Sequence, residues 1–132
     1  MALGPSAFTV NGWLNALFNA TSFNIAQAYI QLHTAEPGAA GTTAVAAETR
    51  RMAVSFGAPS APAAGVITIS NDVQVQYTNI SGTQDAANYS LWDAATSGNF
   101  LGSGVINANA YTAGDTLTFA VGDIDISLNC AT

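Results

Sequence analysis

The chain has 132 residues, which is enough to bury a hydrophobic core, and we expect one domain over residues 1–132. Charged residues make up only 8%, lysine is absent, and the formal net charge is −6. Such a chain lacks the positive surface that nucleic acid or an anionic membrane binds, so we expect neither as a partner.

The shortage of charge also bears on assembly and on compartment. Free monomers usually carry a well-charged surface, so this composition suits a protein whose faces are covered by neighbouring subunits. The start of the chain, MALGPSAFTV, lacks the basic segment and the long apolar run of a signal peptide, and we expect synthesis in a cytoplasm. With Cys130 as the single cysteine, the chain can form neither an internal disulfide nor a cysteine metal cluster.

Residues 9–20, TVNGWLNALFNA, predict a short N-terminal α-helix. Its large apolar residues gather on one face, and Thr9 or Asn11 is expected to cap it. Trp13 and Phe18 on that face are equally compatible with the core of one subunit and with a neighbour's groove. Both are therefore candidate interface residues.

Alternating apolar and polar residues predict strands along the rest of the chain. In AQAYIQLHT (26–34), Ala28, Ile30 and Leu32 point to one face of the strand. The further predicted strands are 51–58, 65–70, 72–78, 88–94, 100–106, 116–122 and 123–128. Short strands between Gly-rich turns predict an all-β fold, an antiparallel β-sandwich of jelly-roll or immunoglobulin-like type, with the short N-terminal α-helix added to it.

The single histidine, His33, lies beside Thr34 and Glu36 in LHTAEPGAAGT, a combination that raises the question of catalysis. Adjacent strand residues point to opposite faces, and no G-x-S-x-G nucleophile motif is present. We expect instead that His33 ends a strand and bonds to nearby backbone or loop, while Pro37-Gly38 starts a loop. We expect no catalytic residues, no cofactor and no enzyme activity.

Two charged pairs are further candidates. Asp123 and Asp125 are predicted on one solvated face of the last strand, because Ile124, Ile126 and Leu128 occupy the other; too few oxygen ligands accompany them for a calcium site, and we expect no bound metal. Arg50 and Arg51 are either an inter-subunit anchor or a surface pair that balances a nearby carboxylate such as Glu48. We favour the interface, which makes both arginines candidate interface residues.

Four segments occur in a characteristic order: LHTAEPGAAGT (32–42), RRMAVSFGAPS (50–60), LWDAATSGNFL (91–101) and AGDTLTFAVGDIDISL (113–128). Together they resemble a family of small virion proteins of tailed bacteriophages, with LHTADPG-like, YARQAVTFG-like and GIWDAASGGNLL-like segments. Such proteins are described as tail-fibre-like, minor tail or head-fibre proteins. Arg51 aligns with the family arginine of the second segment, whereas the aromatic residue two positions before it is missing.

The resemblance implies a virion structural protein that is made in the host cytoplasm and sits on the particle surface. The leading hypothesis is a capsid decoration protein, or minor capsid protein, that binds the major capsid protein as a homo-oligomer, a trimer. The alternative is a minor tail or tail-fibre-base protein that binds other tail proteins at the tail tip. A third class, a glycan-binding module for host adhesion, would need an exposed aromatic platform, for which Trp92 and Tyr89 are the candidates.

Overall fold

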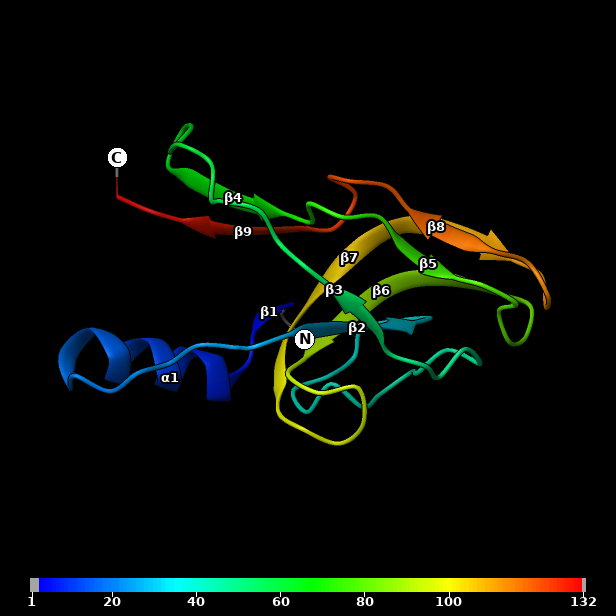
Figure 1. The fold of residues 1–132 in the computed structure, drawn as a ribbon, viewed down its shortest axis with the longest axis horizontal. Helices are drawn as coiled ribbons and strands as arrows, with labels where there is room; N and C mark the ends of the chain where they lie inside the picture. Colours follow the sequence, from blue (N-terminus) through cyan, green and yellow to red (C-terminus); the bar gives the residue numbers. More distant parts are fainter. Residues whose placement is uncertain (1–2, 132) are drawn as a thin grey trace.

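The computed structural model describes residues 3–131 and all side chains among them except those of residues 108 and 109. Its elements are β1 (Gly4–Pro5), α1 (Ala7–Phe18), β2 (Ala28–His33), β3 (Met52–Val54), β4 (Val66–Ser70), β5 (Val75–Tyr77), β6 (Gln84–Trp92), β7 (Phe100–Tyr111), β8 (Leu117–Phe119) and β9 (Asp125–Asn129) (Figure 1). All strand pairs are antiparallel. The predicted all-β sandwich with one short N-terminal helix is confirmed.

The main layer is a five-stranded sheet with the strand order β1-β7-β6-β2-β3. Its centre pairs β2 with β6, with Ile30 opposite Leu91 and His33 opposite Asn88. Ile30 and Leu32 are completely buried, as the alternation of this strand predicts. Their polar neighbours Gln31 and His33 are buried too, and residues 44–46 pair with the end of β2: the amide of Ala46 donates to the carbonyl of Leu32.

The second layer consists of two strand pairs, β5 with β8 and β4 with β9. Buried tyrosines tie this layer to the main sheet. The Tyr77 hydroxyl on β5 donates to the Ile30 carbonyl at 2.7 Å, and the Tyr89 hydroxyl on β6 donates to the Asp125 carbonyl at 2.8 Å. Phe119 on β8 meets the Tyr77 ring edge-on, with 6.4 Å between centroids. These apolar rings with satisfied hydroxyls form the core between the layers.

The helix differs from its prediction in its limits and in its cap. It runs from Ala7 to Phe18, two residues ahead of the predicted 9–20. Ser6 is the N-cap, and its hydroxyl oxygen accepts from the Thr9 amide at 3.2 Å; the prediction that Thr9 or Asn11 caps the helix was wrong. The Thr9 hydroxyl instead donates to the Leu101 carbonyl on β7, which fixes the base of the helix to the sheet.

After the helix the chain turns back along it, as Figure 1 shows. The Phe23 ring packs against Gly12, where a Cβ would collide with the ring, and meets Phe8 edge-on at 5.6 Å between centroids. We call residues 6–27 the N-terminal arm. This arm and the β4–β9 pair extend in the same direction from the main sheet (Figure 1).

Several strand limits also differ from the sequence predictions. β6 begins at Gln84, four residues before the predicted strand 88–94, and β7 continues to Tyr111 instead of ending at residue 106. These two strands pair with each other along most of their length, so residues of low strand propensity are held by a partner that is distant in sequence. β5 is shorter than the predicted 72–78 and leaves Val73 exposed.

Candidate functional site

His33 lies at the centre of a buried polar network. Its Nδ1 is 2.7 Å from the Thr43 carbonyl and its Nε2 is 2.7 Å from the Ser90 hydroxyl, which also accepts from the Trp92 indole N–H at 2.8 Å. A carbonyl can only accept, so Nδ1 carries the proton and Nε2 accepts from Ser90. The imidazole is therefore neutral with both nitrogens satisfied.

Burial lowers the pKa of His33 below its ordinary value of 6.5, because a charged ring would lose its water; the bond to Thr43 opposes the shift and nearby Arg51 adds to it. Since His33 and Ser90 are both completely buried, this serine–histidine pair has no access to a substrate. The expectation that His33 bonds to nearby backbone or loop is confirmed.

The proposed aromatic platform for glycans does not exist at Trp92 and Tyr89. Both rings are buried, and so is Leu91, although adjacent strand residues normally point to opposite faces. A register shift between Leu91 and Trp92 changes the local pairing, and the Arg51 guanidinium covers the indole with its carbon 3.6 Å from the ring centroid. That prediction is corrected.

Arg51 also holds the loop that follows β6. Its Nη1 donates to the carbonyls of Ala94 at 3.1 Å and Ser97 at 2.5 Å, while its Nε donates to the Gln31 side chain. A planar guanidinium can stack on a ring and donate in its own plane at the same time, which an ammonium cannot do. The predicted inter-subunit role of Arg51 stays a prediction, since all of these contacts lie within one chain.

Arg50 pairs with Glu48. This contact corresponds to the alternative in which the arginine balances a nearby carboxylate, and a contact of Arg50 with another subunit stays a prediction. Its Nη2 is 2.7 Å from a Glu48 oxygen, and its Nε and backbone amide donate to the other oxygen at 2.8 and 3.0 Å. The Ser81 amide adds a fourth bond at 3.0 Å. These bonds, above all those from the Arg50 side chain, lower the pKa of Glu48 from 4.5 to about 2, although its complete burial works in the opposite direction.

Asp123 and Asp125 do not share one face of a strand as predicted. β9 begins at Asp125, and Asp123 lies in the preceding turn, where its carboxylate accepts from the Ala120 amide at 2.7 Å. Asp125 accepts from the Ser70 hydroxyl at 2.5 Å, and Ile124 between them is completely buried. Over residues 3–131, no group of three or more His, Cys, Asp and Glu side chains is placed to hold a metal ion.

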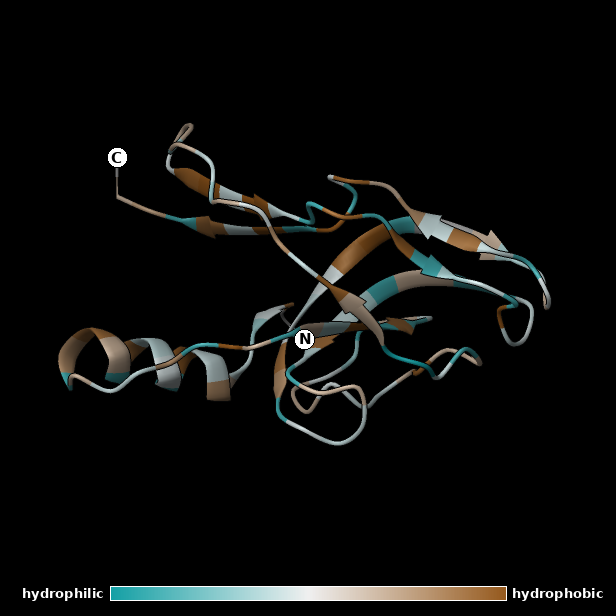
Figure 2. Cartoon of the chain, in the orientation of Figure 1, coloured by the Kyte–Doolittle hydropathy of each residue, from teal (hydrophilic) through white to brown (hydrophobic). Residues whose placement is uncertain are grey.

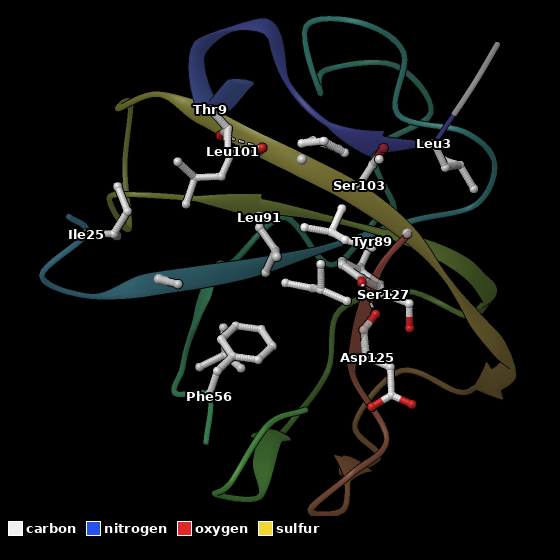
Figure 3. Close-up of a pocket in the computed structure, with 18 of the residues that line it drawn as sticks. Leu3, Thr9, Ile25, Phe56, Tyr89, Leu91, Leu101, Ser103, Asp125 and Ser127 are labelled. Atoms are coloured by element: carbon white, nitrogen blue, oxygen red, sulfur yellow. Dashed lines mark hydrogen bonds between the residues drawn. The ribbon is translucent and has the colours of Figure 1, made fainter. Parts of the chain in front are cut away.

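An apolar groove of about 660 Å³ lies between the N-terminal arm, the main sheet and β9 (Figure 3). Leu91 and Leu101 lie on its floor, Trp13 and Ile25 come from the arm, and Leu128 belongs to the opposite wall. Tyr89, whose pKa is raised to about 12 by burial, fixes the floor to β9 through its bond to the Asp125 carbonyl. Sequence reasoning missed this groove because its walls come from segments that are far apart in the chain.

The helix beside the groove is largely uncovered. Within Ala7–Phe18, Thr9 is the one buried residue, whereas Leu17 is 73% and Phe18 is 74% exposed. Figure 2 shows apolar residues recurring along α1, including the end that projects from the sheets. Of the predicted interface residues, Trp13 lines the groove and Phe18 lies at the exposed end of the helix, and their contact with another subunit stays a prediction. In the described part of the chain, no helix is long and apolar enough to span a membrane.

A search of protein families finds one that matches nearly the whole chain. The family model described as "Podophage GP4 fiber I protein gp80" matches residues 4–127. No curated protein matches the chain. The match agrees with the tailed-phage resemblance of the sequence, at the level of a virion structural protein. The chain belongs to the podophage GP4 fiber I protein gp80 family, and it is a structural protein of the bacteriophage virion.

Proposed function

We propose that this chain is a subunit of a fibre on the outside of the virion, which is nearer to the minor-tail or tail-fibre-base alternative than to the leading hypothesis of capsid decoration. The observation that carries the proposal is the match of residues 4–127 to a family described as a fiber protein. The exposed apolar helix supports it as well, because a fibre subunit must present surfaces that neighbouring proteins cover.

We also propose that the role is structural and not enzymatic. In residues 3–131, every buried side-chain nitrogen or oxygen whose surroundings are described has a hydrogen-bond partner. His33 is neutral, buried and saturated, and the Glu48 carboxylate is neutralised by Arg50. These buried polar groups hold the fold, which suits a protein that must persist on a particle surface.

Capsid decoration is the second candidate. The observation that favours it is the apolar groove between the N-terminal arm and β9, both of which belong to parts that project from the main sheet. A protein that grips neighbouring capsid subunits only after assembly would stabilise the assembled head by mass action. Such binding needs shape and apolar contact more than charge, which this surface offers.

Cryo-electron microscopy of particles that lack this protein would test the proposal. A nonsense codon in its gene allows particles to be grown in suppressor and non-suppressor hosts and compared. We expect the non-suppressor particles to lose fibre density while the head and tail remain. Particles that keep their fibres but lose knobs from the head surface would contradict the fibre role and support decoration.

A further inference from the structure

Four of the exposed residues of α1 form a defined apolar face. Val10, Leu14, Leu17 and Phe18 are exposed and follow the i, i+4, i+7, i+8 spacing that places side chains on one side of a helix. The neighbouring positions Thr9 and Trp13 turn toward the groove of the same chain. We call these four residues the outer face of α1; Phe8 and Trp13, each 41% exposed, are not part of it. A helix that is apolar on this much of its surface is normally buried.

The total surface of the chain points to a missing contact of ordinary size. Its solvent-accessible area is 7228 Å², whereas a folded monomer of 13.4 kDa exposes about 6500 Å². The excess of about 700 Å² is close to the roughly 800 Å² that each partner contributes to a standard protein interface. Both the N-terminal arm and the β4–β9 pair project from the main sheet, which adds to the exposed surface (Figure 1).

The distribution of charge identifies which partner this surface can accept. The chain has a net charge of −6, yet no charged residue precedes Glu36, so the entire N-terminal arm is neutral. Two copies of an acidic chain can therefore meet here without bringing carboxylates together. The arm holds no carboxylate that a strongly basic partner could pair with, and the groove is lined by a single acidic side chain, Asp125, which accepts from the Ser70 hydroxyl.

We propose that the outer face of α1 in one copy lies in the apolar groove of a second copy of the chain. The groove lies directly beside the helix, so each copy carries both halves of the contact and can give and receive a helix. Its volume of about 660 Å³ is roughly four times that of a 150 Å³ cavity that holds benzene, which is enough for several large apolar side chains. A reciprocal contact gives a closed pair, whereas a head-to-tail repeat gives a ring or an open filament.

This proposal does not depend on the fibre role, because it concerns the association of the purified chain. Light scattering coupled to size-exclusion chromatography would give the mass of the wild type, which we expect to be at least twice the 13.4 kDa of one chain. Leu17→Glu on the helix and Leu128→Glu on the groove wall should each raise the dissociation constant by at least ~100-fold, because a carboxylate would enter an apolar contact. Val73→Glu is the matched control, since Val73 is 59% exposed and lies outside both surfaces.

Cross-linking tests the geometry even if a glutamate variant fails to fold. In a Cys130→Ser background, Leu17→Cys and Leu128→Cys chains are prepared separately and then mixed under oxidation. Disulfide-linked dimers of the two different chains should form at least ~10-fold faster than dimers of a Leu128→Cys chain mixed with a Val73→Cys chain. A wild type that stays monomeric at high concentration, oligomers that survive both glutamate variants, or equal cross-linking in the two mixtures would overturn the proposal and leave the groove to another virion protein.

Discussion

Replacing Glu48 with glutamine removes a buried negative charge that four hydrogen bonds stabilise. The Glu48 side chain is completely buried and accepts from the Arg50 side chain and from the amides of Arg50 and Ser81. Glutamine has nearly the same shape, but its amide nitrogen would place one donor against another. Glu48→Gln should therefore leave the fold intact and reduce its stability.

The pKa of Glu48 sets the size of the effect. Its pKa falls from 4.5 in the unfolded chain to about 2 in the folded protein. A difference of about 2.5 pH units at 1.36 kcal/mol each gives about 3 kcal/mol of stability near neutral pH. Because the folded pKa is the lower one, this contribution is complete above pH 4.5 and is lost as the pH falls from 4.5 toward 2.

Urea unfolding at a series of pH values measures this contribution. The difference in unfolding free energy between wild type and Glu48→Gln should be about 3 kcal/mol at pH 7 and should shrink steadily below pH 4.5. Asp85→Asn, at an exposed position of β6, is the control and should change stability by less than about 0.5 kcal/mol. A Glu48→Gln variant as stable as wild type at pH 7, or a difference that does not change between pH 5 and pH 2.5, would refute the reasoning.

Three further variants or titrations address the rest of the fold. Nuclear magnetic resonance should give a titration midpoint for His33, the single histidine, below pH 6.5. The free energy of unfolding should then decrease as the pH falls below 6.5, by up to about 1.4 kcal/mol per pH unit, because the unfolded chain takes up the proton first. A midpoint above pH 6.5 would contradict the buried neutral ring. Gly104→Ala should destabilise the protein by about 1–3 kcal/mol, because its Cβ would collide with the Tyr89 ring at the groove floor. Gly57→Ala is the control and should change stability by less than about 1 kcal/mol, since its Cβ would meet its nearest neighbour at 3.5 Å. Equal urea midpoints for the two variants would argue against this packing. Arg51→Lys should cost about 1–2 kcal/mol and speed hydrogen exchange in residues 93–99, since lysine cannot stack on the indole and donate in plane together; unchanged exchange would show that the arginine does not hold this loop.

Local periodicity was a good guide to the existence of strands but a poor guide to where they end. Ile30 and Leu32 are buried as their alternation predicts, because both side chains lie on the face of the sheet that packs against the core. Gln84 begins a strand without any local signal, because its pairing with Tyr111 on β7 is supplied by a residue far along the chain. Leu91 and Trp92 break the alternation through a register shift that sequence pattern does not reveal.

The polar sites could likewise be predicted where their contacts are local in sequence, and not where the contacts come from distant residues. The environment of His33 could be anticipated because Pro37-Gly38 forces a turn soon after the strand, and the returning loop supplies Thr43. The complete burial of Glu48 could not be anticipated, since it depends on Ser81 and on the loops around it. The groove forms where the N-terminal arm, the main sheet and β9 pack together. The feature of the sequence that pointed to it was the apolar, uncharged N-terminal helix.

Immunogold electron microscopy of intact particles, with antibody raised against this chain, tests the fibre role most directly. The role predicts gold along thin fibres that extend from the particle, with none over the head in particles whose fibres have been sheared away. Gold spread evenly over the heads, and retained after shearing, would contradict the fibre role and assign the protein to the capsid surface.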